Sequence, residues 1–100
     1  MKPDKVLALL GLAMRGRNLV SGEFQTENAV KDGTAVLVIV ATDASDNTKK
    51  LFKDKCSYYN VPVCEYGTKT ALGRAIGKDL RSSLAITDSG LAGAIEKAMQ

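Results

Sequence analysis

Apolar and polar positions along the chain follow extended spacing in some segments and helical spacing in others. Residues 35–41, AVLVIVA, form a continuous apolar run rich in β-branched side chains, which is typical of a strand covered on both faces. Residues 43–59 place their apolar side chains at a period of about 3.6, which predicts a helix. Its inner face is expected to hold Thr48, Leu51, Phe52, Lys55, Cys56 and Tyr59. The same analysis predicts helices over 3–15, 21–31, 68–77 and 88–98, and extended segments over 18–20, 61–65 and 83–87.

Residues with capping or special backbone properties mark the ends of these elements. Asp43 or Ser45 is suited to cap the third helix, Asn60 to end it in a left-handed conformation, and Gly77 to close the fourth. Strands separated by helices of about ten residues indicate crossover connections, with helices on both faces of a sheet. The pattern therefore predicts one α/β domain over residues 1–100, a three-layer α/β/α sandwich around a small, mostly parallel sheet.

Composition agrees with a single domain that has one core. The chain has 100 residues, of which 45% are hydrophobic. No apolar run approaches the ~20 residues that span a bilayer, and the start Met1-Lys2-Pro3-Asp4 has no signal-peptide pattern. A cytoplasmic location is therefore expected. The formal net charge of +3 and the pI near 9.0 hint at an anionic partner.

The sequence has two cysteines and no histidine. Cys56 and Cys64 form no CxxC pair, so we expect neither a structural zinc site nor a disulfide scaffold, but two buried thiols. The absence of histidine removes the commonest general base at neutral pH and every Ser-His or Cys-His nucleophile pair. Asp43 follows the main strand, where α/β sites often lie, yet helix capping explains it more simply than a metal site. A non-catalytic protein without a cofactor is therefore favoured.

The first candidate site is the helix start at residues 21–26, SGEFQT. A helix N-terminus presents unpaired amides, and Gly22 would let an anion approach the backbone closely. Gln25 would then be available to hydrogen-bond the edge of a base, and Lys31 follows one or two turns later. The alternative is an ordinary capped helix with Gln25 in water.

The second candidate site is the loop at residues 77–83, GKDLRSS, which joins a helix to a strand. It places two cations, Lys78 and Arg81, around the apolar Leu80, and exposed loops on a rigid scaffold often carry recognition. Leu80 would stack on an unpaired base, or it would close the end of the core. A further cationic run is expected to be a solvated helix face, and it consists of Lys49, Lys50, Lys53 and Lys55.

Four segments, in their order and spacing, together resemble a known family. They are LGLAMRGRNLVSG at 10–22, AVLVIVATD at 35–43, NTKK at 47–50 and LGRAIG at 72–77. Over nearly its whole length the chain is similar to the bacterial YlxQ-type RNA-binding proteins, which belong to the ribosomal kink-turn-binding family. The resemblance implies a mixed four-stranded sheet with an antiparallel strand inside the α/β/α sandwich. It also implies binding of kink-turn or related bent RNA, without chemistry.

The family reads tandem G·A pairs through the start of the second helix, and its loop before the last strand covers protruding nucleotides. Its pattern at the helix start is glycine, any residue, Asn or Lys (Glu in close relatives), Glu or Gln, and then Lys three positions later. Gly22 and Gln25 match this pattern, whereas Phe24 occupies the polar base-reading position and Asn28 the lysine position. Phe24 would stack rather than hydrogen-bond, and Asn28 lacks the cation. In the loop, Leu80 matches an apolar contact position.

These inferences combine into the hypothesis of a non-catalytic protein that binds structured RNA, kink-turn-like or ribosomal. The residues expected to contact the RNA are Gly22, Phe24, Gln25, Asn28, Lys31, Lys78, Leu80 and Arg81. The alternative is a protein-interaction module on the same fold, in which Phe24 and Leu80 form an exposed apolar anchor.

Overall fold

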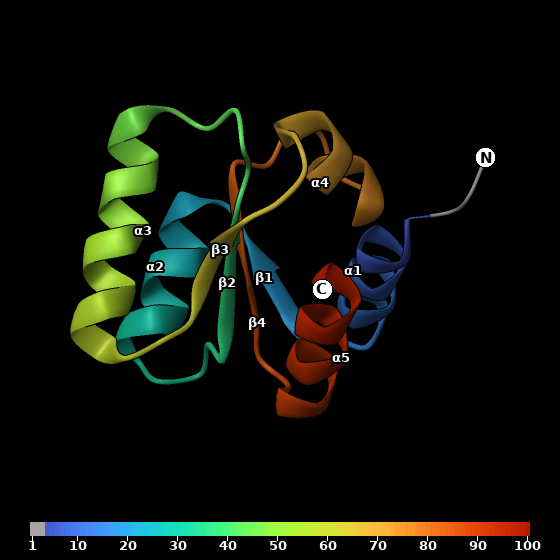
Figure 1. The fold of residues 1–100 in the computed structure, drawn as a ribbon, viewed down its shortest axis with the longest axis horizontal. Helices are drawn as coiled ribbons and strands as arrows, with labels where there is room; N and C mark the ends of the chain where they lie inside the picture. The colour runs from blue at the N-terminus through green and yellow to red at the C-terminus, as the bar shows by residue number, and fades with distance from the viewer. Residues whose placement is uncertain (1–3) are drawn as a thin grey trace.

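A computed structural model describes residues 4–100, and in it a central sheet lies between two layers of helices (Figure 1). The strands are β1 (Leu19–Ser21), β2 (Leu37–Val40), β3 (Val63–Glu65) and β4 (Ser83–Ile86). The helices are α1 (Lys5–Arg15), α2 (Glu23–Lys31), α3 (Asp46–Tyr59), α4 (Lys69–Ala75) and α5 (Ser89–Met99). Pro3, the predicted first residue of α1, lies outside the described residues. Within residues 4–100 no helix is long and apolar enough to cross a membrane.

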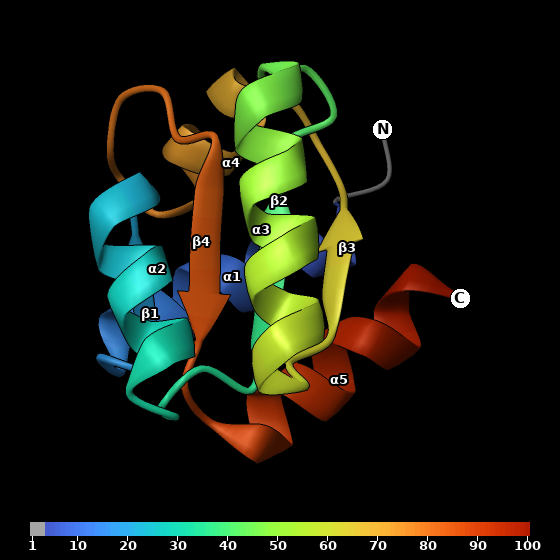
Figure 2. The ribbon, with the colours of Figure 1, turned by 90° about the vertical axis from the view of Figure 1, so that its left-hand side faces the viewer.

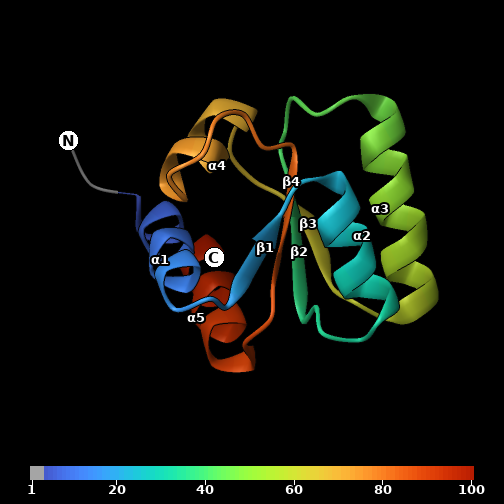
Figure 3. The same ribbon diagram turned by 180° about the vertical axis from the view of Figure 1, so that it is seen from behind.

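The two helical layers confirm the predicted α/β/α sandwich. Helices α2 and α3 cover one face of the sheet, and α1, α4 and α5 lie on the other side (Figures 1 and 3). Every residue of β2 and β4 is buried, as expected for strands covered on both faces. The largest fully buried side chains come from both helical layers and from the sheet, so one core joins all three layers.

The sheet is mixed, and its strands lie in the order β1-β4-β2-β3. The prediction of a mostly parallel sheet, made from the alternation of strands and helices, was therefore wrong. Only β2 and β3 pair in parallel, and β4 is antiparallel to both β1 and β2. The length of the connecting helices explains the difference. Helix α3 has 14 residues and returns the chain along the whole sheet, whereas α4 has seven, a length of about 10 Å. After α4 the chain therefore re-enters the sheet at the end where β3 left it, and runs the opposite way (Figure 2).

The predicted helix ends are confirmed by hydrogen bonds and backbone angles. Ser45 caps α3, since its Oγ accepts a hydrogen bond from the Thr48 amide at 3.1 Å. Asn60 ends α3 in the left-handed conformation, with φ of 59° and ψ of 43°. Tyr59 differs from the expected inner face because it lies at the last residue of the helix, where the core has ended, and it is 41% exposed.

The two thiols are both free, and they differ in burial. Cys56 is buried in the core, and this burial raises the pKa of its thiol to about 11. Cys64 is only half-buried, so the prediction of two buried thiols holds fully for Cys56 alone. Burial, and then the charge of Glu96, raise the pKa of the Cys64 thiol. Both thiols are therefore protonated at neutral pH and are poor nucleophiles.

Candidate functional site

Pairing between β1 and β4 brings the two candidate segments of the sequence side by side. Ser21, the last residue of β1, lies opposite Leu84 in β4. The Gly22 amide donates a hydrogen bond to the Ser83 carbonyl at 3.0 Å, and Arg81 Nε donates one to Ser21 Oγ at 3.1 Å. The start of α2 and the loop between α4 and β4 therefore meet at one end of the sheet (Figure 2).

The start of α2 is open to solvent and has unpaired backbone donors. Gly22 precedes the helix with φ of 92° and ψ of 153°, a conformation that side chains with a Cβ rarely adopt. A Cβ added there would meet nothing within 4 Å, so the space above this backbone is free. The first intrahelical bond runs from the Thr26 amide to the Gly22 carbonyl, which leaves the amides of residues 23–25 without a helical acceptor. Such a helix start suits an anionic group.

Two apolar side chains are exposed on the two adjoining segments. Phe24 in the first turn of α2 is 73% exposed, and Leu80 in the loop is 57% exposed. Gln25 and Asn28 are exposed on α2 as well. Because Phe24 and Asn28 are four residues apart and Gln25 and Asn28 are three apart, these side chains occupy adjacent positions on one side of the helix. Leu80 does not close the end of the core, which was the alternative expected for it.

The loop between α4 and β4 is held firmly against α4. The Lys78 amide donates to the Gly73 carbonyl at 2.8 Å, and the Arg81 amide donates to the Lys69 carbonyl at 3.1 Å. A Cβ on Gly73 would lie 1.5 Å from the Asp79 carbonyl oxygen, so only glycine permits this contact. The backbone is therefore fixed in a position that leaves Leu80 exposed.

The cations of the predicted site differ in their surroundings. Lys78 is exposed and Arg81 is half-buried, and neither forms an ion pair within residues 4–100. Arg81 directs Nη1 to the Leu80 carbonyl at 2.9 Å and retains three further N–H donors. Lys31 lies at the opposite end of α2, and its ammonium group is 3.5 Å from Glu27. The structure thus brings six of the eight predicted residues to the α2 start or the loop. Asn28 lies about one turn further along α2, and Lys31 lies at the far end of the helix.

Sequence analysis missed two residues that build this site, Gly73 and Lys69. Gly73 carried a signal, because a glycine inside a helical pattern often marks a close approach of the backbone. Lys69 acts through its backbone, and its amide donates to the Asp43 carboxylate at 2.8 Å. Asp43 therefore fixes the start of α4 rather than capping α3 as was considered. Across residues 4–100, no group of three or more His, Cys, Asp or Glu side chains could hold a metal ion.

The geometry of the site fits a macromolecular ligand better than a small one. The hollow beside Leu80, lined by Thr70, Arg74, Lys78, Asp79 and Leu80, holds about 190 Å³. Small-molecule sites are usually concave and enclose roughly 300–1,000 Å³. A firm loop, a free helix start, two exposed apolar side chains and unpaired cations instead lie together on an open surface. The fold and the site thus define a small α/β/α binding domain.

Comparison with known proteins identifies the family of this domain. The Ribosomal protein L7Ae/L30e/S12e/Gadd45 family matches residues 4–95, and the chain belongs to this family. RNA-binding protein YlxQ of Bacillus subtilis (strain 168) is 46% identical over 84 residues, which cover 84% of each chain. Large ribosomal subunit protein eL30 of Methanoregula boonei is 32% identical over 85 residues, covering 83% of this chain and 84% of the relative.

A solved structure supports the same assignment of the fold. It is described as a protein with unknown function from Bacillus halodurans C, and it is 42% identical to this chain. It superimposes with a TM-score of 0.93 and covers 97% of this chain and 98% of its own. The mixed four-stranded sheet implied by the resemblance is therefore the correct description of the fold.

Proposed function

We propose that this protein binds structured RNA without catalysis and recognises kink-turn or related bent RNA. The observation that carries the proposal is the junction of the α2 start with the loop before β4, joined by the hydrogen bonds of Gly22 and Arg81. Most of the residues predicted from the sequence to contact RNA gather at this junction, although some 50 residues separate its two segments. Membership of the family and the name of the YlxQ relative support RNA as the ligand.

Phosphate groups of the RNA would be bound at two places on this surface. The free amides after Gly22 would receive one phosphate oxygen, because a helix start favours negative charge and Gly22 leaves room for close approach. Lys78 and the remaining donors of Arg81 would neutralise phosphates on the side of the loop. Lys31 would contribute only if a long RNA stem followed α2 and displaced the contact of Lys31 with Glu27.

Bases would be read and covered by side chains between these phosphate sites. Gln25 and Asn28 have both donors and acceptors, so each is able to pair with the edge of a base. Phe24 and Leu80 would cover unstacked bases, since a bent RNA exposes base faces that a regular duplex hides. Association with the ribosome fits the name of the eL30 relative, and we propose ribosomal RNA as one source of the ligand.

Binding to a kink-turn RNA and to a straight duplex of equal length, measured across a salt series, tests the proposal. We expect tighter binding to the kink-turn and a preference that persists as the salt concentration rises, because base and shape contacts are less screened than phosphate contacts. Equal binding to both, falling by about 0.9 log units per log unit of salt for each phosphate contacted, would leave only a basic surface. Binding to neither RNA would exclude the proposal.

The variant Gln25→Ala tests base reading directly. Loss of a good base contact costs about 1–3 kcal/mol of discrimination, so the preferred RNA should weaken more than the straight duplex. Gln100→Ala, at the exposed C-terminal residue, is the matched control and should change neither affinity. An equal loss on both RNAs in Gln25→Ala would contradict the role of this side chain.

A second candidate function, a protein-interaction module, is favoured by one observation. Phe24 and Leu80 are both exposed, one on each of the two adjoining segments, and exposed large apolar side chains often anchor a partner protein. The substitution Phe24→Glu, examined in an RNA-free preparation, should abolish such a protein contact in a pull-down experiment. Survival of the protein complex in this variant would count against this function.

A further inference from the structure

The edge of the sheet formed by β3 has backbone groups that no strand pairs with. Strand β3 is last in the sheet and pairs only with β2. The Val38 amide donates to the Pro62 carbonyl at 2.9 Å, and the Tyr66 amide donates to the Val40 carbonyl at 3.0 Å. In a parallel ladder alternate residues bond to the same neighbour. The amides and carbonyls of Val63 and Glu65 therefore point away from β2.

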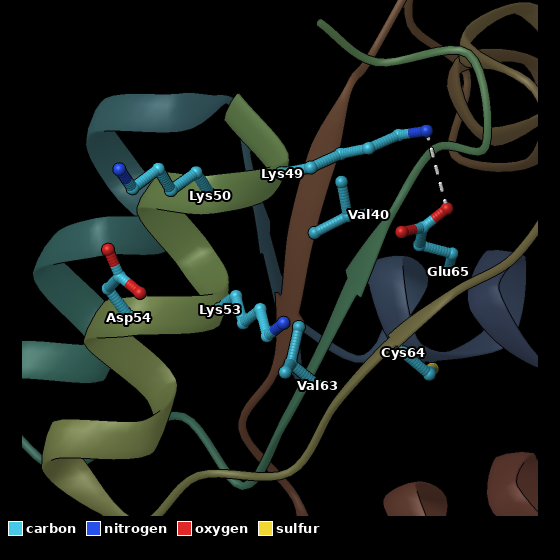
Figure 4. A pocket seen from close by; sticks show the side chains of 8 residues that line it. All are labelled: Val40, Lys49, Lys50, Lys53, Asp54, Val63, Cys64 and Glu65. Atoms are coloured by element: carbon cyan, nitrogen blue, oxygen red, sulfur yellow. Dashed lines mark ion pairs between the residues drawn. The ribbon is translucent and has the colours of Figure 1, made fainter. Parts of the chain in front are cut away.

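A groove of about 720 Å³ runs between this edge and α3. Its lining consists of Val40, Lys49, Lys50, Lys53, Asp54, Val63, Cys64 and Glu65. Lys49 and Lys53 point from α3 toward β3, whereas Lys50 and Asp54 lie on the outer side of the helix (Figure 4). Val63 is 38% exposed in this groove, which gives it an apolar surface beside the free strand edge.

The groove has more positive than negative charge. Three lysines and two carboxylates line it, and Lys49 is paired with Glu65 at 3.4 Å. Among the described residues, neither Lys50 nor Lys53 forms an ion pair. The lysine that faces the strand edge, Lys53, is thus free to bind a carboxylate from a partner. The groove is separate from the proposed RNA surface, which lies by α2 and the start of β4 rather than at the β3 edge.

We propose that this groove binds an extended acidic peptide segment of a partner protein, which adds a strand to β3. A peptide strand supplies both N–H donors and carbonyl acceptors for Val63 and Glu65, and its alternate side chains fit Val63 and the lysines. RNA has donors in its 2′-hydroxyl groups and bases, but it lacks the regular alternation of backbone donors and acceptors that a peptide strand presents to a strand edge. A carboxylate side chain on the peptide complements Lys53, which faces the strand edge, and the charge of Lys50 on the outer side of α3 adds to the attraction at longer range.

The first test uses a fluorescent peptide of alternating Glu and Val residues, followed by fluorescence anisotropy with the full chain. The double substitution Lys50→Glu and Lys53→Glu should weaken its binding by roughly tenfold, as expected for reversal of two exposed charges. The control Lys97→Glu makes the same type of change on α5 and should leave binding unchanged. Lys53→Ala serves as a milder variant if the double substitution unfolds the protein. A peptide of alternating Lys and Val should not bind.

The second test separates strand addition from charge attraction. Bound peptide should slow hydrogen exchange at the amides of Val63 and Glu65, and a peptide with proline at alternate positions should fail to bind because it lacks the donors. Equal binding of the proline peptide, or no binding of the Glu-Val peptide, would overturn the proposal.

Kink-turn RNA distinguishes this groove from the proposed RNA site. It should bind the double lysine variant as it binds the unchanged protein, and it should not displace the peptide. Displacement together with loss of RNA binding in the variant would mean that the groove binds nucleic acid instead.

Discussion

Two groups of cations on this protein differ in what already neutralises them. Lys78 and Arg81 in the loop before β4 have no carboxylate partner within residues 4–100. On α3, by contrast, Lys49 pairs with Glu65 and Lys55 pairs with Glu27. Of the lysines on this helix, only Lys50 and Lys53 form no ion pair among the described residues. A cation that must first leave an internal partner gains less from a phosphate than a free one. The sequence shows both groups as basic, and only the fold distinguishes available charge from occupied charge.

The substitution Gly73→Ala should reduce RNA recognition most strongly, because it disturbs the loop without changing any charge. The added Cβ would lie 1.5 Å from the Asp79 carbonyl oxygen, so the loop with Lys78 and Leu80 must move. Overpacking of this kind costs about 1–3 kcal/mol of unfolding free energy, measurable by urea denaturation. RNA preference should be lost even where the protein remains folded.

Gly93→Ala is the matched control for this substitution, because its Cβ would meet nothing within 4 Å on α5. An alanine in a helix is favoured over glycine, so this variant should be unchanged or more stable by up to about 1 kcal/mol. Unaltered RNA binding by a stable Gly73→Ala protein would show that the loop position does not matter for recognition.

The next largest effect is expected from comparing Arg81→Ala with Lys55→Ala. Removing Arg81 deletes a cation and its hydrogen bond to Ser21, and should lower affinity for kink-turn RNA by about 1.5–3 kcal/mol. Lys55 is already paired with Glu27, so Lys55→Ala should stay within about 0.5 kcal/mol of the unchanged protein. Isothermal titration with the same RNA measures both. Similar losses in the two variants would refute the distinction between free and occupied cations.

A salt series compares the exposed Lys78 with the half-buried Lys49. Lys78→Ala should reduce the slope of log affinity against log salt by about 0.9, the value for one released counterion at a duplex. Lys49→Ala should leave the slope unchanged, because Lys49 is paired with Glu65 beside β3. If Lys49→Ala lowers the slope as much as Lys78→Ala does, the RNA also contacts α3.

Local features of the fold could be predicted from the sequence because they depend on residues close in the chain. Ser45 and Asn60 were identified as end residues from their own chemistry, and the structure confirms them. The direction of β4 could not be obtained in this way. It depends on α4 being too short to cross the sheet. The pattern over residues 68–77 predicts a helix, but it does not show at which end of the sheet the next strand begins.

The candidate site was predictable as two separate segments, and its assembly was not. The start of α2 and the loop around Leu80 each showed a suitable composition, but their contact requires the pairing of β1 with β4. Gly73 inside a predicted helix signals close packing, but the segment that packs against it, the loop at Asp79, is seen only in the structure. Lys31 illustrates the opposite case, since its ion pair with Glu27, four residues earlier on the same predicted helix, could have been inferred from the sequence, yet only its charge was considered.

The smallest expected effect concerns a carboxylate, Asp4, whose charge is stabilised by hydrogen bonds. Tyr66 donates a hydrogen bond from its hydroxyl to Asp4 Oδ2 at 2.7 Å, and the Leu7 amide donates to Oδ1 at 3.0 Å. These bonds, that of Tyr66 first, lower the pKa of Asp4, because both favour its charged form. The stability from this group is therefore present above the pKa of an unfolded aspartate and is lost as pH falls through the lowered pKa.

The variant Tyr66→Phe should raise the pKa of Asp4 toward its ordinary value, as measured by a carbon-13 NMR titration of the carboxyl group. The difference in stability between the two proteins should shrink as pH falls, because Asp4 becomes protonated and no longer attracts the hydroxyl as strongly. Asp32 is the internal control, since its lowered pKa comes from Thr34 and should not move. An unchanged pKa of Asp4 in Tyr66→Phe would mean that the backbone amides of Leu7 and Val6 stabilise the charge without Tyr66. The Tyr66 bond would then have no measurable part in joining the end of β3 to the start of α1.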